Sequence, residues 1–157
     1  MSLNFCFIGA GNLATNLAKE LHDKVGRVVQ VYSRTENAAS ELARQLGTSF
    51  TTNTDQITSA ADIYFVALKD SAVPEVLSKI QLKNKLLVHC SGSLLLSALS
   101  PFSENTGVFY PLQTFSKSRN VNFKEIPIFI EANSSDNQQI LEDIAKKISG
   151  KVNVSAF

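Results

Sequence analysis

The chain has 157 residues, a length that suits one domain of about 150 residues with a sizeable core. Its 15 Lys and Arg against 14 Asp and Glu leave a net charge of +1, which argues against an electrostatic nucleic-acid binder and a polybasic membrane-surface protein. No apolar run approaches the roughly 20 residues of a membrane helix, and no basic segment of a secretory signal precedes the first one. The two cysteines suggest neither a disulfide framework nor a metal site, so we expect a cytoplasmic protein without a bound metal.

In the first half of the chain, short apolar runs alternate with helical patterns. Leu13, Leu17 and Leu21 recur at the spacing of an amphipathic helix, and Gly47 is a suitable residue to end a second helix. The run that ends at Leu68 is the strongest candidate for a buried strand. The expected elements are strands at residues 3–8, 28–32, 49–51 and 62–68, with helices at residues 13–21, 38–46 and 55–60 between them.

The second half of the chain continues the alternation. Asp70 or Ser71 is expected to cap a helix that carries Pro74 in its first turn, and Ser135 with Gln138 is a candidate capping box. Strands are expected at residues 86–89, 107–110, 126–130 and 152–154, with further helices near residues 94–99 and 135–148. This order predicts the α/β class, with a doubly wound, mostly parallel sheet of about eight strands.

A glycine-rich turn separates the first expected strand from the first helix. It has the spacing G-x-G-x-x-A, in which Gly9 permits the tight turn, Gly11 lets the backbone approach a pyrophosphate, and Ala14 allows close helix–strand packing. The helix N-terminus would add free amides and a partial positive charge. Two alternatives are a turn of small residues without a ligand and a methyltransferase loop, although no acidic residue leads into this loop. The residues expected to bind a dinucleotide here are Gly9, Ala10, Gly11, Asn12 and Leu13.

The end of the second strand indicates which dinucleotide is preferred. An NAD-binding domain places a carboxylate there to bind the ribose 2′-hydroxyl, and this chain has Ser33, Arg34 and Thr35 instead. The guanidinium can pair with a 2′-phosphate, and the two hydroxyls can donate hydrogen bonds. The sequence therefore favours NADP over NAD. The alternative is an exposed arginine beside a hydroxyl that caps the next helix.

Further candidate residues follow the other strands, because ligands of an open parallel sheet bind outside its carboxyl edge. Ala67, Leu68 and Lys69 are expected near the cofactor ribose and nicotinamide. After the fifth strand come an imidazole, hydroxyl groups and a flexible backbone, and we expect these residues to face a substrate: His89, Ser91, Gly92 and Ser93.

His89 is the candidate for the catalytic group, since an imidazole can donate to a carboxylate or polarise a carbonyl. The equally open alternative is a partly buried histidine whose hydrogen bonds are satisfied within the protein. After the sixth strand, Gln113 is expected to offer a polar contact to the substrate. Tyr110 is a conceivable general acid, but packing with a solvated hydroxyl is the more usual role for such a tyrosine. Cys6 is expected to be inert in the core.

Four segments in this order resemble one family of oxidoreductases. They are residues 7–14, 33–35, the H-x-S-G stretch within residues 89–93 and the P-L-Q-T-F stretch within residues 110–115. Proteins of that family have an N-terminal Rossmann-like domain and a C-terminal helical domain of unknown function. They are related to pyrroline-5-carboxylate reductase and to the deazaflavin-dependent NADP oxidoreductases. The resemblance implies NADP at the first two segments and a substrate pocket near the last two.

The resemblance also implies a domain organisation. Residues 1–157 would form one NAD(P)-binding domain, and the helical domain that closes the cleft and commonly forms a homodimer would lie outside this chain. We therefore expect the chain alone to bind cofactor but to turn over little. The expected reaction is hydride transfer to or from a small C=O or C=N substrate, with no nucleic-acid or membrane partner. The alternative is a non-catalytic module that senses NADP(H).

Overall fold

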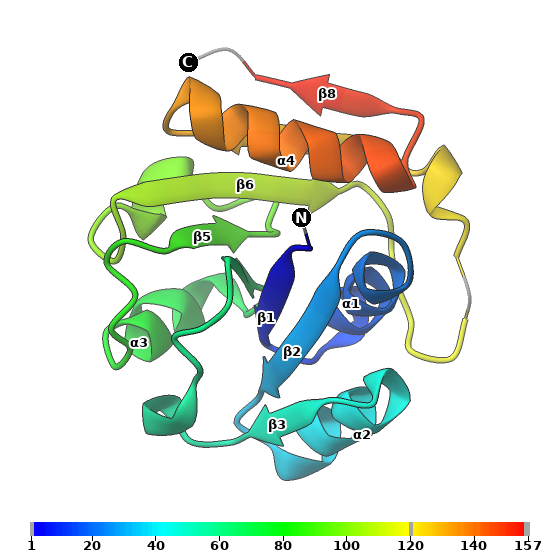
Figure 1. Cartoon of the computed structure of the whole chain (residues 1–157). Coiled ribbons are helices and arrows are strands. Elements are labelled where there is room, and N and C mark those ends of the chain that lie inside the picture. The colour runs from blue at the N-terminus through cyan, green and yellow to red at the C-terminus, as the bar shows by residue number, and fades with distance from the viewer. Residues whose placement is uncertain (1, 120, 156–157) are drawn as a thin grey trace.

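The computed structural model describes residues 2–119 and 121–155. Over these residues the chain forms one eight-stranded sheet in the order β3-β2-β1-β4-β5-β6-β7-β8, flanked by helices (Figure 1). The strands are β1 (Asn4–Ile8), β2 (Arg27–Tyr32), β3 (Ser49–Thr51), β4 (Ile63–Val66), β5 (Leu86–His89), β6 (Asn105–Pro111), β7 (Ile128–Ala132) and β8 (Val152–Val154). The α-helices are α1 (Asn12–Lys24), α2 (Glu36–Leu46), α3 (Val73–Leu77) and α4 (Ser135–Ile148). The predicted α/β class and doubly wound sheet are confirmed.

The sheet reverses its winding direction beside β1. The chain first builds β2 and β3 outward on one side of β1, and then returns to build β4, β5 and β6 on the other. All neighbours pair in parallel except β6 and β7, which are antiparallel. The carboxyl ends of β1 to β6 therefore lie along one edge, where an open α/β sheet binds its ligands.

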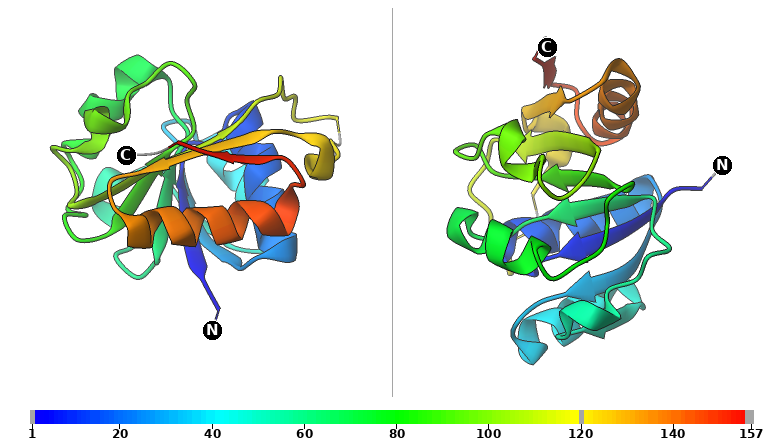
Figure 2. Two further views of the ribbon diagram at one scale, coloured as in Figure 1. Left: turned by 90° about the horizontal axis from the view of Figure 1, so that it is seen from above. Right: turned by 90° about the vertical axis from the view of Figure 1, so that its left-hand side faces the viewer.

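Both faces of the sheet are covered, which explains the continuous apolar runs of the central strands. Side chains of β1 alternate between two buried clusters, with Phe5 and Phe7 in one and Cys6 and Ile8 in the other. Helices α1, α2 and α4 complete the first cluster, and α3 contributes to the second. Figure 2 shows α4 on one side of the sheet and the segment between β5 and β6 on the other.

Phe65 of β4 lies at the centre of the first cluster. Its ring stacks on Phe7 at a centroid distance of 5.1 Å and meets Phe5 and Phe109 edge-on at 5.6 Å. All four rings are fully buried. They tie β1, β4 and β6 together beneath the helices, so the positions of the strand ends depend on this packing.

Some local predictions were wrong. The helix expected at residues 55–60 is only the 3₁₀ turn η1 (Thr54–Gln56), because the Gln30 side chain accepts a hydrogen bond from the Thr58 amide and holds the chain extended. The helix expected at residues 94–99 shortens to the 3₁₀ turn η3 (Leu96–Leu99). Two further 3₁₀ turns are η2 (Asp70–Ala72) and η4 (Phe123–Glu125).

The cap of α4 also differs from the prediction by one residue. Ser134 is the N-cap, with extended backbone, and its side chain accepts a hydrogen bond from the Asn137 amide at 3.1 Å. Ser135 already belongs to the helix, so the expected pairing of Ser135 with Gln138 as a capping box does not form. The end predicted for α2 is confirmed, since Gly47 adopts a φ of 65° directly after Leu46.

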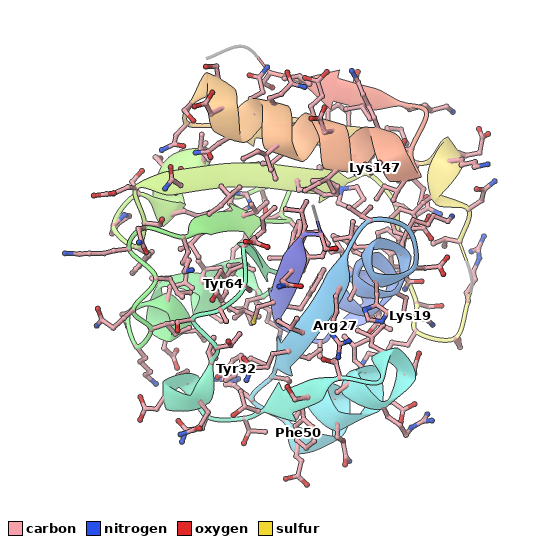
Figure 3. The ribbon with its side chains drawn as sticks, in the orientation of Figure 1. Lys19, Arg27, Tyr32, Phe50, Tyr64 and Lys147 are labelled. Atoms are coloured by element: carbon pink, nitrogen blue, oxygen red, sulfur yellow. The ribbon has the colours of Figure 1, made fainter. Side chains whose placement is uncertain are left out.

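We predict that Phe65→Ala lowers the free energy of unfolding by about 3–5 kcal/mol, because it opens a cavity among the four rings. Phe50→Ala is the matched control, since Phe50 lies on the edge strand β3 and is 41% exposed (Figure 3). We expect a loss below about 1 kcal/mol there. Urea denaturation of both variants makes the comparison, and equal losses would contradict the assigned core.

Candidate functional site

The turn after β1 passes very close to the segment that follows β4. The Gly9 amide donates to the Tyr32 carbonyl at 2.8 Å, and Gly9 has a φ of 119°. A Cβ at this position would lie only 2.2 Å from the Ala67 carbonyl oxygen. Both the positive φ and the close approach require glycine, so the turn brings the ends of β1, β2 and β4 together.

Gly11 faces open space instead. A Cβ on Gly11 would have no heavy atom of the surrounding structure within 4 Å, and Gly11 is the N-cap of α1. The first hydrogen bond within α1 runs from the Thr15 amide to the Gly11 carbonyl at 2.9 Å. The amides that precede Thr15 in the first turn have no acceptor within the helix and point out of its N-terminus. No acidic side chain occupies that turn. This geometry suits an anion such as a pyrophosphate.

Two adjoining hollows follow the carboxyl edge of the sheet from this turn. The first has a volume of about 240 Å³ and the second about 290 Å³, and both are lined by Gly11, Ala67 and Leu68. The first is also lined by Gly9, Ala10, Ser33, Arg34, Thr35, Lys69, Ala72 and Val76. The second is also lined by Asn12, Leu13, Ala14, Val66, Asp70, Cys90 and Ser91. The structure thus brings all the residues predicted to bind the cofactor into one continuous groove, which we call the edge groove.

The end of β2 supplies the basic rim of the edge groove. The Thr35 amide donates to the Ser33 hydroxyl at 3.2 Å, and the two hydroxyl oxygens lie 3.3 Å apart. Thr35 is the N-cap of α2 but its side chain makes no capping bond. The Arg34 side chain is 72% exposed, and its guanidinium reaches Glu75 at 4.0 Å. An exposed pair at that distance contributes little, so the guanidinium is available to a ligand anion.

His89 lies beneath the site rather than in it. The ring is only 1% exposed, Nδ1 accepts a hydrogen bond from the Ser91 amide at 3.1 Å, and Nε2 lies 3.3 Å from the Leu95 carbonyl oxygen. These bonds require a neutral ring with its proton on Nε2. Burial lowers the pKa of His89 accordingly. Both nitrogens hold the loop after β5, so this geometry gives the predicted substrate contact and catalytic role of His89 no support.

Asp70 joins the ends of β4 and β5. Ser93 Oγ donates to Asp70 Oδ2 at 2.5 Å, and the Ser91 and Ser93 hydroxyl oxygens lie 3.1 Å apart. Hydrogen bonds from Ser93 and then Ser91 lower the pKa of Asp70. The expected role of Asp70 or Ser71 as a helix cap was wrong, because Ala72 is the N-cap of α3 and the Asp70 carboxylate accepts a hydrogen bond from Ser93 instead. This chain of hydroxyls keeps a carboxylate ionised beside the second hollow.

Other candidates have simpler placements. Cys6 and Cys90 are buried, and burial raises the pKa of each thiol to about 12, so neither is a thiolate at neutral pH. Gln113 is exposed and lines neither hollow of the edge groove. Gly92 does not line them either, but it packs tightly against the ring of Tyr110.

A third cavity of about 460 Å³ opens beside the edge groove, between the loop after β5 and the strands β6 and β7. Ser91 lines both this cavity and the second hollow. Sequence reasoning missed Glu131 and Phe129 of β7 here, and it gave Tyr110 mainly a packing role. The signal for Glu131 was a single carboxylate near the end of an otherwise apolar strand.

The fold and the edge groove are those of a dinucleotide-binding α/β domain. Comparison with known families agrees: residues 4–92 match the model of the family described as "NADP oxidoreductase coenzyme F420-dependent", and the chain belongs to that family. The resemblance inferred from the sequence motifs is thereby confirmed. A search of curated proteins found no match.

Several solved structures share the fold. A Bacteroides fragilis protein provisionally described as an NADP oxidoreductase has 46% identity and a TM-score of 0.94, covering 98% of this chain and 61% of that one. A Thermotoga maritima protein has 24% identity and a TM-score of 0.76, covering 96% and 57%. A pyrroline-5-carboxylate reductase from Coxiella burnetii has 17% identity and a TM-score of 0.77, covering 100% and 60%. The chain spans about three fifths of the length of these structures.

Within the part of the chain that the structure describes, no helix combines the length and apolar character needed to cross a membrane.

We predict that Gly9→Ala lowers the free energy of unfolding by about 2 kcal/mol or more, because its φ and the Ala67 carbonyl both oppose a side chain. Gly11→Ala is the matched control and should cost about 1 kcal/mol or less, since it loses only a favourable N-cap. Urea denaturation compares the two variants. A Gly9→Ala variant as stable as Gly11→Ala would refute the close approach.

His89 should contribute to the pH dependence of stability. The pKa of His89 in the folded chain is below its ordinary value of 6.5 because the ring is buried. As the pH falls below about 6.5, the unfolded chain binds a proton more readily than the folded chain does. The free energy of unfolding therefore decreases, by at most about 1.4 kcal/mol per pH unit. His89→Gln keeps an acceptor and a donor but removes the titration. Denaturation at pH 7.5 and 5.5 should show a smaller loss in this variant than in the unaltered chain. Equal losses would contradict the neutral, buried ring.

Proposed function

We propose that this chain is the NADP(H)-binding domain of an oxidoreductase that transfers a hydride to or from a small C=O or C=N substrate. The observation that carries the proposal is the edge groove, where an open helix N-terminus, a basic rim and the end of β4 adjoin along one sheet edge. The family to which the chain belongs supports it, because its description names NADP.

Different residues along the groove would hold different parts of the cofactor. The first turn of α1 and Gly11 would bind the pyrophosphate with backbone amides. Arg34 and the hydroxyls of Ser33 and Thr35 would bind the 2′-phosphate, since no carboxylate stands at the end of β2 to bind a free 2′-hydroxyl instead. Glu75 is the acidic neighbour of Arg34, and its distance of 4.0 Å leaves the guanidinium free to turn toward a phosphate.

The second hollow would receive the nicotinamide end. Ala67, Leu68 and Leu13 give it an apolar wall, and Ser91 with Asp70 give it a polar one. When bound, the nicotinamide supplies or accepts the hydride. The protein's contribution here is orientation: Asp70 fixes Ser93, Ser93 adjoins Ser91, and the Ser91 hydroxyl is thereby held at the boundary between the groove and the third cavity.

The experiment that tests the proposal is calorimetric titration with NADPH and NADH. We expect NADPH to bind more tightly, and Arg34→Gln to weaken NADPH binding by about tenfold while leaving NADH nearly unchanged. The estimate is modest because the guanidinium is mostly exposed. Equal affinities for the two dinucleotides in the unaltered chain would contradict the proposed preference for NADP.

Two further variants complete that experiment. Arg27→Gln is the matched control, since Arg27 is an exposed arginine at the opposite end of the same strand and should leave both affinities unchanged (Figure 3). Gly11→Val fills the open space beside α1 and should abolish binding of both dinucleotides. If NADPH binds but no carbonyl or imine compound oxidises it in the longest natural form of the protein, the chain is instead a sensing module.

A further inference from the structure

The third cavity lies on the face of the sheet that α4 does not cover. Gly107 of β6 faces α4, since a Cβ at this position would collide with the Leu141 side chain of that helix. Successive side chains of a strand point to opposite faces, so Val108 and Tyr110 lie on the face away from α4 and line the cavity. Figure 2 shows α4 and the segment between β5 and β6 on opposite sides of the strands. Leu94 and Leu95 of that segment form the outer wall of the cavity.

An aromatic wall is fixed in place on this face. Tyr110 and Phe129 are paired residues of β6 and β7, and their rings stack at a centroid distance of 6.3 Å. On its other side Tyr110 packs so closely on Gly92 that a Cβ there would lie 2.6 Å from the ring. The Tyr110 ring therefore has little freedom to move, and the cavity has a preformed aromatic wall. The cavity volume of about 460 Å³ suits a small organic ligand.

A single carboxylate faces this apolar surface. Glu131 pairs with Val108 across β6 and β7, and Val108 pairs with His89, so the three side chains form one row on the same face. Among the residues that the structure describes, no hydrogen bond or salt bridge engages the Glu131 carboxylate. The lining in the same described part contains no Lys or Arg. The negative charge of Glu131 also acts on His89, whose pKa it raises against the larger lowering effect of burial.

The charge restricts what can occupy the cavity. An uncharged apolar occupant would cover the Glu131 carboxylate and leave it without a partner, which is costly in a low-dielectric site. A cationic group satisfies the carboxylate and is also attracted to the faces of aromatic rings. Ser91 connects the cavity to the second hollow of the edge groove, so such a ligand would lie beside the cofactor end.

We propose that the third cavity binds a small organic cation, a primary or secondary ammonium that carries an aromatic or branched hydrophobic group. Glu131 pairs with the ammonium, and Tyr110, Phe129 and the leucines of the loop pack against the hydrophobic group. Binding of this cation stands on the cavity alone. Its identification as the substrate of the oxidoreductase rests on the proposed function.

The test is a titration followed by ¹H–¹⁵N NMR, with three probes of similar shape: 2-phenylethylamine, the neutral 2-phenylethanol and the anionic phenylacetate. We expect the amine to shift the amide signals of the loop at residues 91–95 and of β6 and β7. The alcohol should bind about tenfold more weakly, and the anion should not bind measurably. Equal affinities for the three probes, or shifts confined to other parts of the chain, would overturn the proposal.

Two substitutions with the same chemical change separate charge from shape. Glu131→Gln should weaken binding of the amine by about tenfold and should not weaken binding of the alcohol, which has no charge to pair with the carboxylate. Glu104→Gln is the matched control, because Glu104 is exposed just before β6 and does not line the cavity. Unchanged amine binding in a folded Glu131→Gln variant would overturn the proposal. So would concentration-dependent shifts of the same amides without amine, since a second copy of the chain would then cover the cavity.

The same samples separate this site from the cofactor site. Titration with NADPH should give the same affinity in Glu131→Gln as in the unaltered chain, since Glu131 lines only the third cavity. An unaltered chain that binds the amine but not NADPH would refute the proposed function and leave the cation site standing. A chain that binds NADPH but not the amine would refute the cation site alone.

Discussion

The close approach of Gly9 to the Ala67 carbonyl is the constraint on which the rest of the structure depends. It brings the end of β1 against the end of β4 at the point where the sheet reverses its winding direction. The same turn starts α1 with open amides and places the end of β2 beside them. A side chain at Gly9 would separate these three strand ends, and the edge groove would lose its continuous floor.

Beneath the other half of the site, a neutral His89 has a comparable structural role. Its two nitrogens bond to backbone groups on either side of the loop after β5, and burial keeps the ring uncharged. This arrangement sets the direction of Ser91, whose hydroxyl continues through Ser93 to Asp70. A histidine that holds a loop thus positions polar groups for the groove without itself reaching it.

The site has two charged ends of opposite sign. Arg34 stands at the rim where β2 ends, while Asp70 and Glu131 lie toward β5, β6 and β7. A ligand that spans the edge groove would place its anionic groups at the first end. The carboxylates at the second end favour a cationic or hydrogen-bond-donating partner. This polarity supports the proposal of separate cofactor and cation sites that meet at Ser91.

The sequence by itself determined the fold class and the location of the groove. The G-x-G-x-x-A turn and the Ser33–Arg34–Thr35 segment are local patterns, in which adjacent residues carry both the backbone geometry and the chemistry. The buried strands were equally evident, since parallel strands covered on both faces are continuously apolar. Such features can be inferred because each depends on residues close together in the chain.

Only the tertiary structure decided the partners of Asp70, His89 and Glu131. Asp70 stands at a helix start, where a cap is the usual local role, but Ser93 from the next strand end offers its carboxylate a hydrogen bond. For His89 the sequence left two roles open, a substrate contact and a buried ring with satisfied hydrogen bonds, and only the folded loop brings the Leu95 carbonyl to its Nε2. Glu131 reaches the third cavity because the register of β7 on β6 sets it opposite Val108. These outcomes depend on strand order and register, which bring together residues far apart in the sequence and which no local pattern contains.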